Sequence, residues 1–142
     1  MRTHDGRWEA HAAAQAANVG PMRTALVKFA AEHGAGRSAQ TDIALAVSEG
    51  LTNAVVHAFL AQAVGTMRVI AVASADVLHV SIIDDGTGMS PRDDSPGMGV
   101  GLTVIDRLTS SLEIRGGPGG RGTEMRLTLD VPGMRADGAG RA

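Results

Sequence analysis

The spacing of apolar and polar positions changes along the chain from a helical to a strand-like period. Apolar side chains recur every three or four residues in 18–34 and 38–63, which predicts two helices. Alternation takes over in 66–74 and 77–85, which predicts two strands that pair as an antiparallel hairpin. Weaker alternation at 7–13 predicts an edge strand near the N-terminus.

The pattern continues after a segment rich in Gly and Pro at 86–98, which we expect to form a loop. Helical spacing returns at 99–111, and strands are expected at 112–117 and 123–131. This order of elements predicts an α/β (α+β) two-layer sandwich, with a mixed, mostly antiparallel sheet and the helices packed on one face. It does not favour doubly wound βαβ units.

Individual residues mark where the predicted helices begin and end. Asn18 is expected to cap the first helix and Gly34 to stop it. Ser38 or Thr41 is expected to open the second helix. Gly50 interrupts this second helix at a cost of about 1 kcal/mol relative to Ala, which indicates that another element packs closely against the backbone there.

Composition and charge narrow the class of protein. The 142 residues suit one domain, which we expect to span 1–131, followed by a small, polar, disordered tail at 132–142. A net charge of −2 without a basic block argues against a nucleic-acid or anionic-membrane partner. The absence of cysteine excludes disulfides and thiolate metal sites. With neither a membrane span nor a signal peptide in the pattern, we expect a cytoplasmic protein.

The second predicted helix carries Glu49, Asn53 and His57 at intervals of four residues, so these polar side chains share one side of the helix. The opposite side bears an apolar stripe of Ile43, Val47, Leu51, Ala54 and Ala58. Further apolar residues are expected to flank the polar three, namely Leu45, Val56 and Leu60. Two interpretations stay open at this point: an ordinary polar face, or the wall of a half-buried pocket.

In the pocket interpretation each polar residue has a chemical role. Asn53 offers an amide oxygen, which is a ligand that hard cations accept. Glu49 can take a proton from an attacking hydroxyl group. We expect His57 to be a structural hydrogen-bonding residue rather than a ligand.

A second segment places Asp84 at the end of a predicted strand, before Gly86 and Gly88. The carboxylate could accept a hydrogen bond from an exocyclic amine, and the glycines allow a ligand to approach the backbone. An ordinary Asp-Gly turn has the same sequence, so this segment alone does not decide between a site and a turn.

A third segment, 97–106, places glycines before a helix whose free N–H groups favour an anion such as phosphate. It is not a P-loop, because no Lys follows, and it is not a Rossmann fingerprint, because no strand leads into it. A G-x-G-x-x-G match at Gly117, Gly119 and Gly122 leads into a strand, so we attribute it to a hairpin turn.

The order and spacing of these segments resemble the motifs of the GHKL or Bergerat-fold ATPases, the superfamily of gyrase, Hsp90, histidine kinases and MutL. The matching positions are Glu49 and Asn53, then Asp84, Gly86 and Gly88, then Gly97, Gly99, Gly101 and Leu102, and finally Gly122 and Thr123. The resemblance covers about residues 7–131 and implies the Bergerat ATP-binding fold. Within the superfamily, the small size and the stretches "VSEGLTNAVVHA" and "PGMGVGL" resemble the bacterial anti-sigma-factor serine/threonine kinases.

This resemblance implies ATP and Mg²⁺ as cofactors and a role for each matching residue. It implies that Asn53 coordinates Mg²⁺, that Glu49 is the general base and that Asp84 binds the adenine amino group. The remaining nucleotide contacts would come from Gly86 and Gly88 at the adenine, from Gly99, Gly101 and Leu102 at the phosphates, and from Thr123 near the adenine through water. Further nucleotide-binding residues would be Met89, Gly97 and Val100. Arg23 occupies the place of a partner-contacting arginine.

The resemblance further implies a kinase that phosphorylates a Ser or Thr of a STAS-type anti-anti-sigma partner and sequesters a sigma factor, and it allows a homodimer. The predicted ATP lid, residues 89–98, is short and carries Arg92 beside Asp93 and Asp94. Two carboxylates near a triphosphate are repulsive. Two alternatives therefore stay open: a nucleotide-gated binding module with weak or no kinase activity, and a stand-alone histidine-kinase-type catalytic domain.

Overall fold

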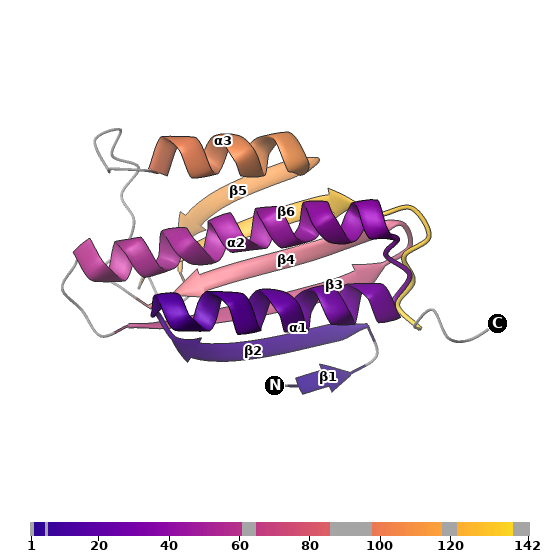
Figure 1. Ribbon diagram of the computed structural model, residues 1–142, viewed down its shortest axis with the longest axis horizontal. Coiled ribbons are helices and arrows are strands. Elements are labelled where there is room, and N and C mark those ends of the chain that lie inside the picture. The colour runs from indigo at the N-terminus through magenta and orange to yellow at the C-terminus, as the bar shows by residue number, and fades with distance from the viewer. Residues whose placement is uncertain (1, 5, 61–64, 86–97, 118–121, 138–142) are drawn as a thin grey trace.

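The computed structural model describes residues 2–4, 6–60, 65–85, 98–117 and 122–137, which form a two-layer sandwich (Figure 1). Its six-stranded sheet has the order β1-β2-β3-β4-β6-β5, and every neighbouring pair of strands is antiparallel. The strands are β1 (Arg2–His4), β2 (Arg7–Ala13), β3 (Thr66–Ser74), β4 (Val77–Asp84), β5 (Ser111–Gly116) and β6 (Thr123–Asp130).

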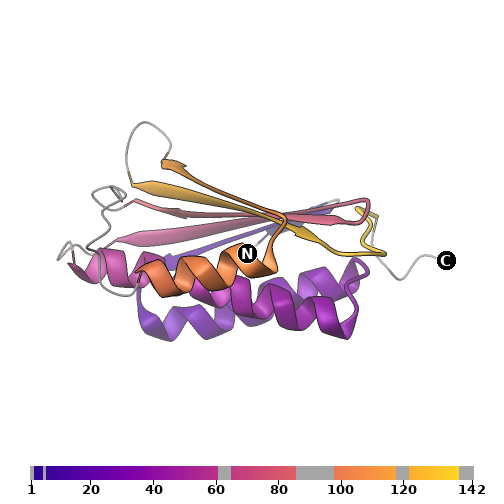
Figure 2. The ribbon, with the colours of Figure 1, turned by 90° about the horizontal axis from the view of Figure 1, so that it is seen from above.

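The helices lie together on one face of the sheet, as Figure 2 shows. They are the 3-10 helix η1 (Ala16–Asn18) and the α-helices α1 (Val19–Glu32), α2 (Arg37–Leu60) and α3 (Met98–Leu108). The predicted fold class is confirmed, with a sheet whose described strands are all antiparallel rather than mixed. Nowhere in the described chain does a helix combine the length and the apolar character that crossing a bilayer requires.

Local interactions explain where several elements begin and end. Gly34 follows the first helix with a φ of +106°, a conformation that favours glycine. Asn18 stands at the N-cap position, but its amide donates to the carbonyl of Ala13 (2.9 Å) instead of capping the helix. The prediction of an edge strand at 7–13 was wrong in one respect, because β1 pairs along β2 and takes the outer position.

The core lies between the helices and the sheet. Some of its largest side chains are at most 2% exposed, namely Trp8, Leu26, Ile43, Leu78 and Leu127. The apolar stripe predicted on the second helix is confirmed, since all five of its residues are buried: Ile43, Val47, Leu51, Ala54 and Ala58. Leu45 is 49% exposed, so it does not form part of a covered wall beside the polar residues.

The packed domain continues beyond residue 131, where the sequence analysis placed its end. Met134 is 1% exposed, and its carbonyl accepts a hydrogen bond from the N–H of Asp76 in the β3–β4 turn (3.0 Å). The N–H of Arg135 donates to the carbonyl of His33 after α1 (2.8 Å). Residues 132–137 thus join the β3–β4 turn to the end of α1, while 138–142 lie outside the described residues.

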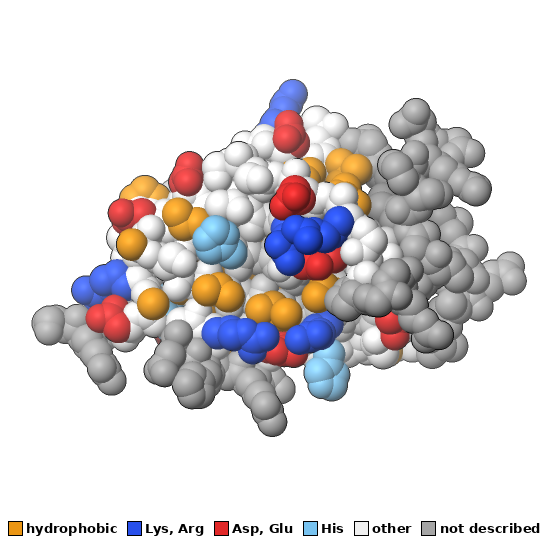
Figure 3. Space-filling model, turned by 180° about the vertical axis from the view of Figure 1, so that it is seen from behind, with side chains coloured by type: hydrophobic (Ala, Val, Ile, Leu, Met, Phe, Trp, Pro, Cys, Tyr) orange, Lys and Arg blue, Asp and Glu red, His pale blue; other side chains and the backbone are white. Residues whose placement is uncertain are grey.

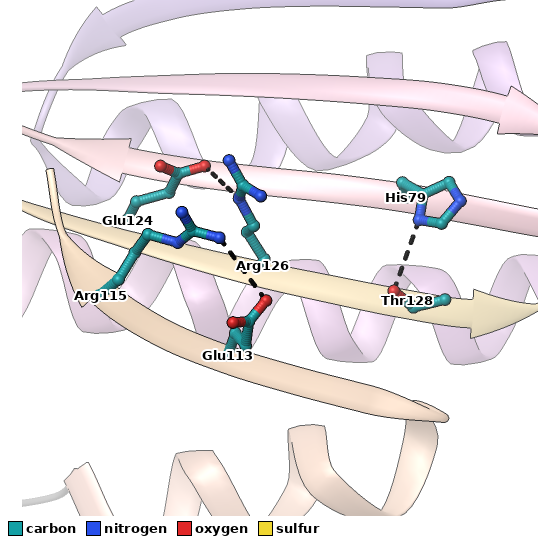
Figure 4. A network of polar contacts seen from close by, with 6 residues as sticks. All are labelled: His79, Glu113, Arg115, Glu124, Arg126 and Thr128. Atoms are coloured by element: carbon teal, nitrogen blue, oxygen red, sulfur yellow. Dashed lines mark hydrogen bonds and ion pairs between the residues drawn. The ribbon is translucent and has the colours of Figure 1, made fainter. Parts of the chain in front are cut away.

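The opposite face of the sheet carries two groups of ion pairs (Figure 3). Hydrogen bonds from Arg68 and Arg7 to Glu9 (2.7 and 2.8 Å) hold the pKa of the Glu9 carboxyl below its ordinary value. Figure 4 shows the second group, in which Glu124 contacts Arg126 (2.7 Å). The hydrogen bond to Glu124 raises the pKa of the Arg126 guanidinium. A cavity of about 290 Å³ beside this group is lined by residues of β4, β5 and β6.

The helix layer approaches the sheet closely at Gly50. A Cβ added to this residue would overlap the Cδ1 atom of Ile82 in β4 and would lie 3.5 Å from Sδ of Met125 in β6. The close packing that the sequence predicted at this glycine is therefore confirmed. The contact places the middle of α2 directly over the central strands.

We predict that Gly50→Ala lowers the free energy of unfolding by about 1–3 kcal/mol, because overpacking outweighs the gain in helix propensity. Adding Ile82→Val removes the overlapping methyl group and should recover part of this loss, although Ile82→Val alone costs about 0.5–1.5 kcal/mol. Chemical denaturation of the single and double variants measures the coupling.

The control for this series is Gly36→Ala, where an added Cβ would meet nothing within 4 Å. It should change stability by no more than about 0.5 kcal/mol. If the losses of Gly50→Ala and Ile82→Val simply add, the two residues do not share the contact described above.

Candidate functional site

The polar side chains predicted on the second helix lie in the C-terminal half of α2, each one turn from the next. Asn53 is 5% exposed and Glu49 is half-buried. The side chain of His57 is 15% exposed. They belong to the part of the helix that Gly50 brings against β4 and β6. Their burial favours the pocket wall over an ordinary polar face.

Asn53 carries a polar group that the described chain leaves unsatisfied. Its Nδ2 atom is buried and has no hydrogen-bond partner among the residues that the structure describes. An unpaired buried donor costs about 1–3 kcal/mol. A buried amide in this state therefore indicates a hydrogen-bond acceptor outside the described residues, such as an atom of a bound ligand.

Asp84 approaches this part of α2 from the end of β4. It is 5% exposed, and its Oδ1 atom lies 3.6 Å from Nδ1 of His57. The next residue, Asp85, makes different contacts, since its carboxylate accepts hydrogen bonds from the N–H and the hydroxyl of Thr66, each at 2.7 Å. Of the two consecutive acids, one lies against α2 and the other ties β4 to β3, a structural role that sequence analysis did not foresee.

Thr123 lies opposite Asp84 in the register between β4 and β6 and is 3% exposed. The preceding Gly122 has a φ of +67°, and a Cβ at this position would overlap the carbonyl oxygen of Asp84. The Gly-Thr pair that the motifs singled out therefore lies against the backbone of Asp84.

The glycine-rich segment forms the start of α3 rather than only a loop before it. The helix begins at Met98, so Gly99, Val100 and Gly101 belong to its first turn. The first N–H groups of a helix have no acceptor within it, and the helix dipole makes this end attractive to anions. Leu102 is partly buried and packs against the core, so its side chain stabilises the helix.

Several predicted residues lie outside the part of the chain that the structure describes. They are Gly86, Gly88 and Met89, Gly97, and the lid residues Arg92, Asp93 and Asp94. Their parts in adenine and phosphate binding stay predictions. In Figure 1 the end of β4, the start of α3 and the C-terminal end of α2 lie at the same end of the molecule.

Arg23 reaches the same helix from α1. Its Nη1 atom donates a hydrogen bond to Oγ of Ser48 (3.3 Å), the residue before Glu49. Sequence analysis proposed a partner contact for this arginine and missed its contact with Ser48, because no pattern within one helix reveals its pairing with another. The contact brings a cation to the turn of α2 that carries Glu49.

The described donors fit a magnesium ion bound with a nucleotide better than a metal held by the protein alone. In the described ranges there is no group of three or more His, Asp or Glu side chains that could hold a metal ion. Mg²⁺ usually keeps water and phosphate ligands and takes few from the protein, so the Asn53 amide suits it. Asp84 suits a base with a donor group, and the start of α3 suits phosphate.

An antiparallel sheet covered on one face by α1, α2 and α3 is the architecture of a GHKL-type ATP-binding domain. The family model of the histidine kinase-like ATPase domain matches residues 12–129. The chain therefore belongs to this family, and the resemblance drawn from its motifs is confirmed.

The similar proteins include anti-sigma factors. The anti-sigma F factor of Thermoanaerobacter sp. (strain X514) is 31% identical over 117 residues, which are 75% of this chain and 80% of the relative. That of Clostridium beijerinckii is 30% identical over 103 residues, 65% of this chain and 72% of the relative. Blue-light-activated histidine kinase 2 of Erythrobacter litoralis is 37% identical over 94 residues, 63% of this chain but only 27% of that protein.

A solved structure has the same fold. It comprises the RsbU and RsbW domains of Rv1364c from Mycobacterium tuberculosis, with a TM-score of 0.67 and 26% identity over 91% of this chain. The present chain spans 33% of that one. Together with the anti-sigma F factors, this match places the chain in the anti-sigma kinase branch of the GHKL family.

We predict that Asn53→Leu does not destabilise the ligand-free protein and raises its free energy of unfolding by about 1–2 kcal/mol, because it removes an unsatisfied buried donor. The matched control is Asn18→Leu, which removes an amide that is bonded to the carbonyl of Ala13. This control should cost about 0.5–1.5 kcal/mol. Urea denaturation without nucleotide measures both, and a loss at Asn53 as large as that at Asn18 would contradict the assignment.

Proposed function

We propose that this protein is an ATP-dependent serine/threonine kinase and anti-sigma regulatory factor that phosphorylates a STAS-type anti-anti-sigma partner. The observation that carries the proposal is the buried amide of Asn53, whose unsatisfied Nδ2 donor calls for an acceptor such as a phosphate oxygen. This amide lies one helical turn from Glu49 on one side and one turn from His57, beside Asp84, on the other. The proposal assigns to these residues, along one stretch of α2 and the strand end beside it, the roles of metal ligand, proton acceptor and adenine-binding acid.

Each residue has one part in the proposed reaction. Asp84 accepts a hydrogen bond from the adenine amine, with Thr123 across the strand pair. Asn53 would hold Mg²⁺ through its amide oxygen, and the first turn of α3 would receive the phosphates. Bound Mg-ATP supplies the phosphoryl group and the counter-charge that its transfer requires. Glu49 takes the proton of the acceptor hydroxyl as that oxygen attacks the γ-phosphorus of ATP, and the bond from this phosphorus to the leaving ADP breaks.

The similar proteins support the class of partner. Those of Thermoanaerobacter and Clostridium reported above are named anti-sigma F factors, and the solved neighbour contains an RsbW domain. Phosphorylation adds a charge of about −1.5 to −2 to the partner at pH 7. This charge would break the complex with the partner and leave the kinase free to bind a sigma factor. A homodimer stays a prediction from the resemblance.

Two other functions keep support from particular observations. The 37% identity to a histidine kinase supports phosphoryl transfer to a histidine on a separate partner. The two acids of the predicted lid, Asp93 and Asp94, support nucleotide-gated binding with little transfer, because they repel the phosphates.

Incubation with labelled ATP, Mg²⁺ and the STAS proteins of the same organism separates these functions. We expect acid-stable phosphate on a Ser or Thr of a STAS protein. Acid-labile phosphate on a histidine would favour the histidine-kinase function, and nucleotide binding without any transfer would favour the gated module. Either of these results would overturn the serine/threonine kinase.

In the same assay we predict that Asn53→Ala abolishes Mg²⁺-dependent nucleotide binding, because it removes the metal ligand. Glu49→Gln should keep nucleotide binding and lose transfer about 10²–10⁴-fold, the usual contribution of a general base. Calorimetric titration measures the binding. Glu113→Gln, on the opposite face of the sheet, is the control and should keep both activities; full transfer by both site variants would refute the assigned roles.

We predict that Asp84→Asn weakens ATP binding about 10–100-fold and GTP binding much less, because a hydrogen bond to a charged group is worth about 1.5–3 kcal/mol. GTP carries a carbonyl where ATP carries the amine, so it does not use the carboxylate as an acceptor there. Competition titrations with the two nucleotides measure the difference. An equal loss for both would exclude an adenine-binding role for Asp84.

A further inference from the structure

The side-chain amide of Asn53 has two polar atoms, and the proposed reaction gives a role to only one of them. Its oxygen, Oδ1, is the assigned ligand of Mg²⁺. Its nitrogen, Nδ2, is a buried donor without a hydrogen-bond partner in the described part of the chain. A cation does not accept a hydrogen bond, so a metal ion bound to Oδ1 would leave Nδ2 unsatisfied. Metal binding alone therefore does not explain the buried nitrogen.

Packing holds this amide in the interior. Asn53 is 5% exposed, and its neighbours on α2, Leu51 and Ala54, are 0% and 3% exposed. Three residues before it, Gly50 lies against Ile82 of β4. Because this turn of the helix is fixed between the core and the sheet, Nδ2 can be satisfied only by an acceptor that is brought to it.

The polar side chains on the same side of α2 do not supply this acceptor. Glu49 lies one turn before Asn53 and His57 one turn after it, and neither accepts a hydrogen bond from Nδ2 in the structure. The acceptor therefore comes from outside the described residues. Under the proposed function, the molecule that approaches Oδ1 is the nucleotide with its metal ion.

We propose that Asn53 binds the phosphate chain of the nucleotide directly, through a hydrogen bond from Nδ2 that does not depend on the Mg²⁺ at Oδ1. Magnesium in nucleotide sites is coordinated by phosphate oxygens, so a negatively charged acceptor would lie next to the amide. Hydrogen bonds to a charged acceptor are about twice as strong as those between neutral groups. The inference rests on the proposed function, to which it adds a second contact at the same residue.

Removal of the metal separates this contact from metal binding. If Asn53 acted only through Mg²⁺, or if Nδ2 donated to a water bound to the metal, a substitution at Asn53 would not affect nucleotide binding in the absence of metal. A direct hydrogen bond to phosphate predicts an effect that persists. Adenosine carries the base without a phosphate, so its affinity shows whether a substitution has disturbed the base-binding end.

The test measures the affinities of the full chain for ADP and for adenosine, with Mg²⁺ and after removal of metal by EDTA. Without metal, we expect Asn53→Leu to weaken ADP binding about 10–100-fold, the effect of a lost hydrogen bond to a charged group, and to leave adenosine within about twofold. Equal affinities of the wild-type and Asn53→Leu chains for metal-free ADP would overturn the proposal. A wild-type chain that binds ADP with Mg²⁺ but not without it would overturn it as well.

The matched control is Gln40→Leu, which also replaces an amide by an apolar side chain. The amide of Gln40 donates to the carbonyl of Ala35 (2.8 Å) at the opposite end of α2. This variant should leave the affinities for ADP and adenosine unchanged. If it weakens metal-free ADP binding as much as Asn53→Leu does, the effect is not specific to Asn53 and the proposal is wrong.

Two further measurements do not depend on the folding of Asn53→Leu. Asn53→Asp keeps an oxygen for Mg²⁺ but replaces the donor by a charged acceptor, so it should weaken binding of ADP with Mg²⁺ by about tenfold or more. Binding as tight as that of the wild type would contradict a role for Nδ2. In proton–nitrogen correlation spectra of the wild type, the side-chain NH₂ signals of Asn53, identified by their absence in Asn53→Asp, should move downfield with ADP but not with adenosine. Signals that ADP leaves in place would also overturn the proposal.

The failure of this inference differs from the failure of the proposed function. A folded wild-type chain that binds no adenine nucleotide even with Mg²⁺ would refute the proposed function. Binding with Mg²⁺ that Asn53→Leu abolishes, together with equal metal-free affinities for ADP, would refute only the direct contact of Nδ2 with phosphate.

Discussion

The contact between α2 and the sheet at Gly50 is the constraint on which the candidate site depends. Because this residue has no side chain, the helix backbone comes down onto Ile82 of β4. Asp84 follows Ile82 on the same face of the strand, and Asn53 follows Gly50 within one turn of the helix. One close contact between backbone and side chain thus sets the distance from the polar face of α2 to the acid at the end of β4.

Much of the fold could be predicted because the helices and strands keep regular periods. The bounds of β3 were predicted to the residue, since its alternation stops where the turn begins. β1 could not be predicted, because a strand of 3 residues is too short to show a period, and its pairing with β2 decides its place. Residues 132–137 have the composition of a disordered tail, yet Met134 anchors them in the core. A single buried side chain does not change composition enough to reveal this.

In the candidate site, too, local relations could be predicted from the sequence and contacts between distant segments could not. Helical spacing was enough to put Glu49 and Asn53 on one side of α2, because that relation is local. The contact of His57 with Asp84 joins segments far apart in the sequence, and a single sequence holds no measure of the distance between a helix and a strand. For the same reason the hydrogen bond from Arg23 to Ser48 was not foreseen. The sequence shows which functional groups each segment carries. The packing at Gly50 and Gly122 decides which of these segments lie next to one another.

The two ends of the candidate site differ in the contacts that the described chain gives to their polar side chains. The carboxylate of Asp84 lies beside His57, and the backbone carbonyl of Asp84 lies against Gly122 before β6. These contacts are present without a ligand, so Asp84 itself needs little ordering when one binds. The Nδ2 atom of Asn53, in contrast, has no partner within the described ranges, and the cost of about 1–3 kcal/mol is recovered only when a ligand satisfies or displaces it. Under the proposed function, such a site would select its ligand at Asp84 and gain stabilisation at Asn53. It would therefore favour a molecule that carries a hydrogen-bonding base and a metal-binding phosphate chain together over a molecule that carries either alone.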